Sequence, residues 1–454
     1  MKSGFIFGEC VLLLKMIIDM NRIILVGNGF DKAHGMATTY QEFMDDYWKS
    51  VGNEIFDGSS FKSYQDEFIY FKIPGERYNL TFILPEYSSG ITSYSKFKSL
   101  LDSCNTPSIE FVFLNKFFER LSETSLNNWV DVENEYYAAL VEILKSHERN
   151  NSNEIPSLEK LNNDFTAVRR LLEEYLSKIE KTNAKILSVQ DKILAPLRAQ
   201  DIAHSHKMGL TKHIPQRIDK IDVEQKRLAK QNTELSDIYD IEDFRNGNIQ
   251  KWVSELRAIE ERGNRRQQIR KCMDMLPSFL SLPEEILLLT FNYTDTVERY
   301  IPASSQALLP HVECIYIHGR LKDKSNPIIF GYGDELDTNY KAIEDRNDNR
   351  YLEYIKSTGY HRTDGYRRLL EFAESGYFQI FIMGHSCGNS DRTLLNTLFE
   401  HSNCMSIKPF YHQISNEKDN YSDIVRNISR NFKDKQLMRE RVVNQTYCEP
   451  LSKN

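Results

Sequence analysis

A short apolar run that ends in a glycine turn limits the folds open to this chain more than any other feature. Residues 23–26 are isoleucine, isoleucine, leucine and valine, and this β-branched, aliphatic run predicts a buried strand. The turn that follows reads Gly27-Asn28-Gly29-Phe30-Asp31, and a helix is predicted near residues 40–48. A buried strand, a glycine turn and a helix in this order are typical of the start of doubly wound nucleotide-binding folds.

Further buried strands are predicted in the second half of the chain. Each is an apolar run bounded by Gly, Pro, Asn or Asp, and they cover residues 286–291, 314–317, 328–330 and 378–383. Helical patterns separate some of them, at 366–373 and 393–400. The sequence therefore predicts an α/β fold with a Rossmann-like, mostly parallel sheet.

A helical insertion is expected to split this body. Apolar residues from Leu158 to Ile193 follow alternating steps of three and four, and Pro196 ends the series. A second stripe runs from Ile218 to Leu235. Two such stripes joined by a loop predict an antiparallel coiled-coil hairpin. This hairpin would serve either as a spacer or dimer surface, or as an arm that senses a partner.

We expect five segments along the chain. Residues 1–19 are an extension or an upstream start, with Met1, Met16 and Met20 as candidate first residues. The Rossmann-like domain is expected in two parts, 20–150 with a helical subdomain and 276–412, around an inserted arm at 151–275. Residues 50–110 are aromatic-rich and show no clear helical or strand periodicity, and residues 413–454 are expected to form a surface segment.

Charge and cysteine usage narrow the function classes. The formal net charge is −7, which argues against general nucleic-acid binding because such proteins are usually basic. The seven cysteines are scattered and form no CxxC pair, so a cysteine zinc site is not expected. We expect reduced thiols and a cytoplasmic protein. The N-terminal apolar run is too short to span a bilayer, so no membrane association is expected.

Polar or glycine-containing segments follow all five predicted strands. In an open α/β sheet, ligands bind at the carboxyl ends of the strands, so these segments are expected to meet. Their convergence predicts a polar cleft for a nucleotide-like ligand. The segments contain Gly27 to Asp31, then Asn292 and Asp295, then His318, then Gly331 to Glu335, and finally Gly384, His385, Ser386, Asn389 and Asp391.

The last strand end also fits a different chemistry. Gly384-His385-Ser386-Cys387-Gly388 matches the GxSxG nucleophile elbow, with a strand before it and a helix after it. A serine hydrolase using Ser386 would then need an acid and a histidine downstream, and His412 is the remaining candidate histidine. In the competing interpretation Ser386 and Gly388 form a phosphate-contacting turn and Asp391 caps the following helix. Neither a GxxxxGK[ST] loop nor a GxGxxG turn is present.

Six ordered segments resemble one known family. The opening segment Val26 to Gly35 with Thr39, Tyr40 and Phe43 is similar to the signature of the AbiH family of bacterial phage abortive-infection proteins. The same resemblance covers residues 129–133, 291–295, 317–319 and 331–335, and the segment from Gly384 to Asp391. It spans most of residues 21–412 apart from the expected arm, and it implies anti-phage defence.

The AbiH family in turn resembles the sirtuin-like domains of bacterial defence systems. That resemblance implies an NAD-binding Rossmann-like fold in which Asn292 and His318 are the catalytic residues of an NAD glycohydrolase. The sirtuin zinc cysteines are missing, so no metal is expected. NAD or a related nucleotide, a phage-derived trigger and further copies of the chain are the partners that we expect. A nucleotide-binding sensor that acts through its coiled-coil arm without cleaving NAD is the alternative. The expected NAD-binding residues are Gly27, Asn28, Gly29, Phe30, Asp31, Asp295, Gly384, His385, Ser386, Asn389 and Asp391.

Overall fold

The computed structural model describes residues 20–55, 62–72, 90–103, 109–124, 129–148, 157–181, 189–239 and 278–452. The expected extension at 1–19, with Met1 and Met16, lies outside these residues.

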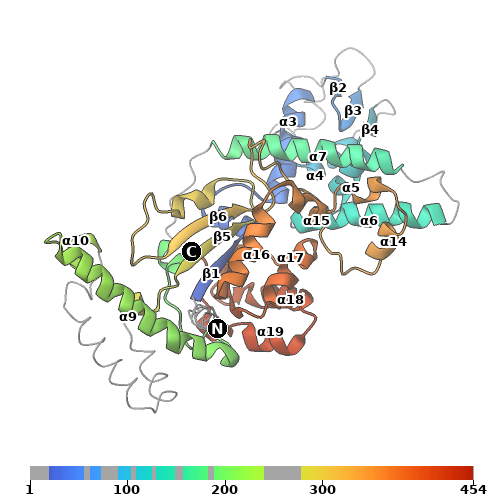
Figure 1. Ribbon diagram of the computed structural model, residues 1–454. Helices are drawn as coiled ribbons and strands as arrows, with labels where there is room; N and C mark the ends of the chain where they lie inside the picture. The colour runs from blue at the N-terminus through green and yellow to red at the C-terminus, as the bar shows by residue number, and fades with distance from the viewer. Residues whose placement is uncertain are drawn as a thin grey trace.

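A five-stranded parallel sheet forms the centre of the molecule (Figure 1). Its strands follow the order β6-β5-β1-β7-β8, so the first strand lies in the middle and pairs with both β5 and β7. This is the strand order of a doubly wound nucleotide-binding sheet, and its switch point lies between β1 and β7. The predicted parallel α/β sheet is confirmed. The strands are β1 (Met20–Val26), β5 (Glu285–Thr290), β6 (His311–Tyr316), β7 (Tyr377–Met383) and β8 (Cys404–Phe410).

One strand prediction is wrong and one strand was not predicted. Residues 328–330 are buried but adopt no strand, and the Ile329 amide donates a 2.8 Å hydrogen bond to the His318 carbonyl just past the end of β6. The edge strand β8 was not predicted because Lys408 and Pro409 interrupt its apolar run. Lys408 is nevertheless buried, and it donates a 2.8 Å hydrogen bond to Asp201.

Apolar side chains cover both faces of the sheet, because successive residues of a strand point to opposite sides. Ile23 and Leu25 pack into one cluster with three helices, α16 (Gly365–Ser375), α17 (Arg392–Phe399) and α18 (Tyr421–Arg430). Ile24 and Val26 pack into the other cluster with three short helical segments, α2 (Asn28–Ala33), α8 (Gln190–Ile193) and η5 (Thr296–Tyr300). Both clusters extend to the carboxyl ends of the strands, where Val26 and Met383 are still buried in the second of them.

A largely helical body with its own core lies beside the carboxyl ends of the strands (Figure 1). It also contains a three-stranded antiparallel sheet, and two of its strands lie in the aromatic-rich region 50–110, where the sequence showed no helical or strand periodicity. The elements of this body are α3 (Tyr40–Ile55), β2 (Tyr64–Gln65), β3 (Ile69–Lys72), α4 (Tyr94–Ser103), β4 (Glu110–Phe113), α5 (Lys116–Glu123), α6 (Trp129–Glu148) and α7 (Leu158–Ile179).

The predicted coiled-coil hairpin is not formed by the described residues. The stripe on α7 packs into the helical body, with Phe165 stacked on Phe330 at a ring separation of 5.1 Å. The second helix, α9 (Lys207–Ala229), packs against the amino ends of the strands, far from α7 (Figure 1). Both stripes are thus core-facing surfaces of globular packing, which shares the three-and-four spacing of coiled coils. Residues 151–156, 182–188 and 240–275 of the expected arm lie outside the described residues.

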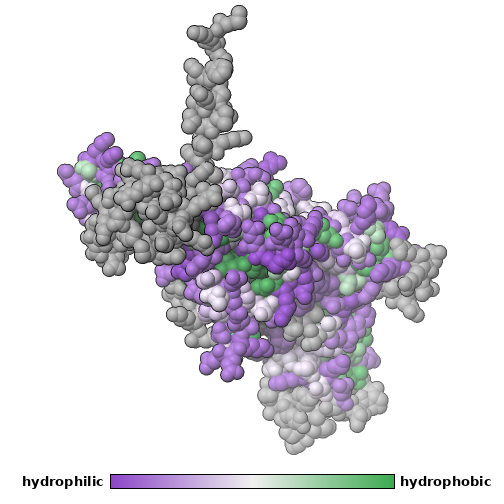
Figure 2. All heavy atoms as spheres, turned by 90° about the horizontal axis from the view of Figure 1, so that it is seen from below, coloured by the Kyte–Doolittle hydropathy of each residue, from purple (hydrophilic) through white to green (hydrophobic). Residues whose placement is uncertain are grey.

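The face shown in Figure 2 is mostly hydrophilic, with small apolar areas near its middle. Scattered apolar areas of this kind are ordinary on folded proteins. None of the helices in the described ranges is long and apolar enough to cross a membrane.

Candidate functional site at the carboxyl ends of the strands

A pocket of about 700 Å³ opens where the strands of the central sheet end. Its walls come from the first turn, from the segments after β5, β6 and β7, from two leucines of α7 and from the C-terminal segment. Ligand pockets commonly fall between 300 and 1,000 Å³, and in doubly wound sheets they lie at this switch point. The residues predicted from sequence that line it are Gly27, Asn28, Gly29, Asp31, Asn292, His318, Gly384, His385, Ser386 and Asp391.

Three predicted site residues do not line this pocket. Phe30 is fully buried and packs against His34 and Tyr300 on the far side of its helix. Asp295 is exposed at the start of η5, and Asn389 begins the short helical turn η8 (Asn389–Asp391) without reaching the pocket wall.

The glycines of the first turn allow two strand ends to pack backbone against backbone. A Cβ on Gly27 would lie 2.5 Å from His385 Cα, and a Cβ on Gly384, whose φ is +79°, would lie 2.0 Å from the Phe30 amide nitrogen. The amides of Gly27 and Gly29 donate to the carbonyls of Met383 and Gly384 at the end of β7, and the Phe30 amide donates to the Gly27 carbonyl within the turn. These three amides therefore already have acceptors within the protein.

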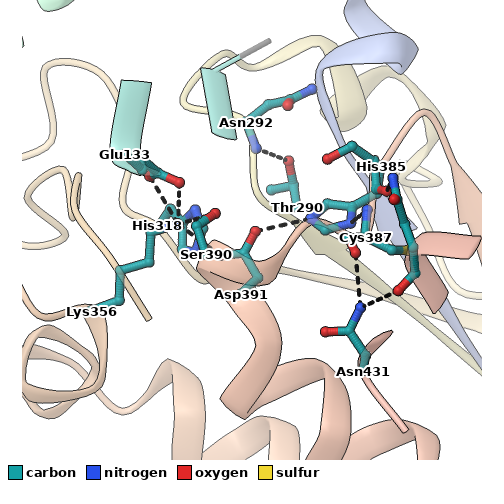
Figure 3. Close-up of polar contacts among 12 residues, drawn as sticks. Glu133, Thr290, Asn292, His318, Lys356, His385, Cys387, Ser390, Asp391 and Asn431 are labelled. Carbon is teal, nitrogen blue, oxygen red and sulfur yellow. Dashed lines mark hydrogen bonds and ion pairs between the residues drawn. The ribbon is translucent and has the colours of Figure 1, made fainter. Parts of the chain in front are cut away.

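Asn292 fastens the end of β5 to the first turn. Its side-chain amide donates a 3.0 Å hydrogen bond to the Gly27 carbonyl, and its backbone amide donates to the Thr290 hydroxyl (Figure 3). On the same wall the Thr294 hydroxyl donates a 2.6 Å hydrogen bond to Asp31 Oδ2. Asp31 Oδ1 has no hydrogen-bond partner among the described residues, and burial raises the pKa of this carboxyl to about 6.

A buried ionic cluster forms the opposite wall of the pocket (Figure 3). Lys356, the first residue of α15 (Lys356–Gly359), lies 2.9 Å from the carboxylate oxygens of Glu133 on α6 and 2.7 Å from Asp391 Oδ1. The exposed fractions of the three residues are 1%, 5% and 5%. Asp391 therefore does not cap α17 with its side chain, because its carboxylate is held by this cluster.

Two histidines also contact the Asp391 carboxylate. His318 Nε2 lies 3.2 Å from Oδ1 and His385 Nε2 lies 3.4 Å from Oδ2. His385 Nδ1 accepts a 3.0 Å hydrogen bond from the Cys387 amide, so its Nε2 carries the proton. Donation from His318 Nε2 to the carboxylate likewise leaves Nδ1 of His318 as the acceptor.

The cluster separates the pKa values of its members. Burial raises the pKa of Asp391, but Lys356 and His318 outweigh it and hold that pKa well below its usual range. Burial raises the pKa of Glu133 to about 7, against the opposing effect of Lys356. Burial and the neighbouring Lys356 lower the pKa of His318 to about 4, so the imidazole is neutral at pH 7. For Lys356 the two carboxylates outweigh burial and raise the pKa.

The hydrolase geometry is not assembled around Ser386. Within the ranges that the structure describes, its hydroxyl makes no hydrogen bond to a histidine, and the nearby His385 is committed to Asp391 and Cys387. The Ser386 carbonyl accepts a 2.8 Å hydrogen bond from Asn427. His412 lines the same pocket but hydrogen-bonds to Asn420 through its backbone.

Lys356 and Glu133 were not among the predicted site residues. Lys356 follows no predicted strand, so nothing in its local sequence marked it. Glu133 lies in the segment at 129–133 whose resemblance to the AbiH family had been noted, and that resemblance was the available signal. Across the described ranges, no group of three or more His, Cys, Asp or Glu side chains is arranged to hold a metal ion.

The fold and the pocket define a doubly wound α/β protein with a buried acid–base cluster at its switch point. Residues 23–413 match the family described as "Bacteriophage abortive infection AbiH". The chain therefore belongs to the AbiH family. No curated protein and no solved structure matches the chain significantly.

Proposed function

We propose that this AbiH protein acts in phage abortive infection by binding NAD in the strand-end pocket and hydrolysing the bond between nicotinamide and ribose. Depletion of NAD would stop an infected cell before phage are released. One observation carries the proposal: Asn292 and His318, at the ends of adjacent strands, line one pocket of about 700 Å³ at the switch point of a doubly wound sheet. A distant likeness to sirtuin-like domains supports the same ligand.

The chemistry of the pocket wall fits a nucleotide. Asp31 Oδ1 is a buried acceptor without a partner among the described side chains, which suits a ribose hydroxyl donor. Asn292 offers a carbonyl oxygen that is free to accept from a second hydroxyl, because its amide group donates to Gly27. Lys32 also lines the pocket, but its ammonium group is paired with Glu42 at 2.8 Å, so a pyrophosphate would have to compete with that carboxylate for its charge.

In this proposal Asn292 and His318 orient the nicotinamide ribose. His318 is neutral at pH 7, and with Nε2 donating to Asp391 its Nδ1 accepts from a ribose hydroxyl. Asp391 and Lys356 hold the imidazole in that orientation, so the geometry exists before the substrate binds.

The test is incubation of the purified full chain with NAD, alone and with lysate of phage-infected cells, while nicotinamide release is followed. Wild type should release nicotinamide in at least one condition, and Asn292→Ala and His318→Ala should lower the rate by 100-fold or more. His311→Ala, at the exposed start of β6, is the matched control. No turnover in any condition, or full turnover in both site variants, would contradict the proposal.

A second candidate function rests on a different observation. Leu172 and Leu176 of α7 line the pocket, so a bound nucleotide would contact the helical body directly. The protein would then be a sensor that binds a nucleotide without cleaving it and signals through that body, in place of the coiled-coil arm. Nucleotide retained by the purified protein, together with undiminished phage protection by His318→Ala, would favour this candidate.

We also expect a homo-oligomer and a phage-derived trigger. Light scattering on the purified chain measures the mass of the oligomer. The same measurement with infected-cell lysate reports a change of mass caused by the trigger.

A further inference from the structure

Glu133 places a carboxylate at the pocket from outside the central sheet. It lies on α6, in the helical body, and lines the same pocket as Asn292 and His318. Its side chain is 7% exposed, and both oxygens lie 2.9 Å from Lys356 Nζ. A carboxylate oxygen can accept more than one hydrogen bond, so these contacts leave room for a water molecule.

The ionisable groups around Glu133 come from four other segments. Lys356 and Asp391 are its nearest charged neighbours, and the phenols of Tyr293 and Tyr360 also interact with it electrostatically. Burial keeps both phenols neutral by raising their pKa values well above the ordinary range. One lysine is thus shared between two buried carboxylates, and the pKa of Glu133 rises to about 7 while that of Asp391 falls.

His318 is poorly suited to take a proton during the reaction. Its Nε2 is bound to Asp391, and its pKa is lowered to about 4, so it is a weak base at pH 7. Asp391 itself already accepts from Lys356, His318 and His385. The hydrolysis proposed above nevertheless needs a base, because the attacking water must lose a proton.

We propose that Glu133 is the general base of this hydrolysis, an inference that rests on the proposed function. The Glu133 carboxylate takes one proton from a water molecule whose oxygen forms a new bond to ribose C1′. The C1′–N bond breaks, and its electron pair neutralises the positive charge of the nicotinamide ring, so the leaving group needs no proton. Glu133 then releases its proton to solvent, and the products are nicotinamide and ADP-ribose.

The test compares Glu133→Gln with wild type in nicotinamide release from NAD across pH 5 to 9. Gln keeps the size and polarity but cannot accept the proton, so kcat should fall at least 100-fold while KM changes less than about threefold. The acidic limb of the wild-type pH profile should disappear. Sodium azide, a nucleophile that needs no deprotonation, should accelerate Glu133→Gln and leave His318→Ala unchanged. Glu142→Gln, exposed on the same helix, is the matched control.

No turnover by wild type overturns the proposed function and this inference together. If wild type turns over NAD and Glu133→Gln keeps its rate or its acidic limb, the role of Glu133 alone is overturned. Loss of activity without azide rescue, together with weakened binding of ADP-ribose, would show a structural role. Asp31, whose pKa is also raised, is the competing base. If the acidic limb disappears in Asp31→Asn and persists in Glu133→Gln, Asp31 is the general base.

Discussion

The ammonium group of Lys356 lies 2.7 Å from the Asp391 carboxylate, where both side chains are buried. Removal of a buried charge is costly unless its partners are also removed, because an uncompensated charge remains in a poorly solvated place. Lys356→Met would leave Glu133 and Asp391 facing each other without a cation. Through Lys356, Glu133 of the helical body is joined to Asp391, which follows the sheet strand β7. The same contacts shift the pKa values of both carboxylates.

We expect Lys356→Met to lower the free energy of unfolding by about 3–5 kcal/mol. Urea denaturation followed by circular dichroism measures this change. Lys341→Met is the control, because Lys341 is 79% exposed and pairs only at the surface, so its effect should stay within about 0.5 kcal/mol. A loss below about 1 kcal/mol for Lys356→Met would contradict the stabilising role of the cluster.

The raised pKa of Glu133 gives stability a defined pH dependence. The folded pKa is about 7 against an ordinary value of 4.5, so the folded state holds this proton more tightly than the unfolded chain. Its contribution is complete below about pH 4.5, declines as the pH rises and is lost above about pH 7. Relative to wild type, Glu133→Gln should therefore gain about 3 kcal/mol of stability between pH 4.5 and 7.5.

The measurement for that prediction is the midpoint of urea unfolding at five pH values across this window. Differences between variant and wild type remove the contributions of the other titrating groups. Glu142→Gln should run parallel to wild type, since it is exposed and paired with Arg120 at the surface. A Glu133→Gln difference that is flat with pH would mean that Glu133 titrates normally.

The sequence predicted the central sheet well because its strands are buried on both faces. Residues 23–26, 286–291 and 378–383 are almost entirely apolar, and such runs are typical of strands in a parallel sheet that is covered on both faces. Asn292 and His318 could be placed at one edge for the same reason, since parallel strands bring their carboxyl ends together. The prediction failed at β8, where the buried Lys408 depends on Asp201, more than 200 residues earlier in the chain.

The ionic cluster lay beyond the reach of sequence for a related reason. Glu133, Lys356 and Asp391 come from a helix, a short turn and a strand end that meet only through tertiary packing. Local pattern likewise failed for α7, because its three-and-four spacing is the same whether its partner is a second long helix or a globular core. The partner of α7 is the globular core, since Phe165 contacts Tyr136, Phe330 and Tyr354.

The placement of α7 predicts that its stripe stabilises the whole body. Phe165 is fully buried among aromatic rings, so Phe165→Ala should lower the free energy of unfolding by about 3–5 kcal/mol. Val223→Ala, at a position of α9 that is 67% exposed, should change it by less than about 0.5 kcal/mol. Urea unfolding compares the two variants. A small effect at Phe165 would support a separate arm.

The close packing of the first turn against the end of β7 predicts different outcomes for two glycines with the same backbone conformation. Gly384 has φ +79° and Gly90 has φ +80°, so alanine meets the same local strain of about 1 kcal/mol at both positions. At Gly90 the added Cβ has no heavy atom within 4 Å among the described neighbours, whereas at Gly384 it would lie 2.0 Å from the Phe30 backbone nitrogen. Gly90→Ala should therefore fold and lose about 1 kcal/mol, while Gly384→Ala should lose at least about 3 kcal/mol or fail to accumulate as soluble protein. Soluble yield and the midpoint of thermal unfolding measure both outcomes. Equal losses for the two variants would mean that the backbone contact between the first turn and the end of β7 does not form.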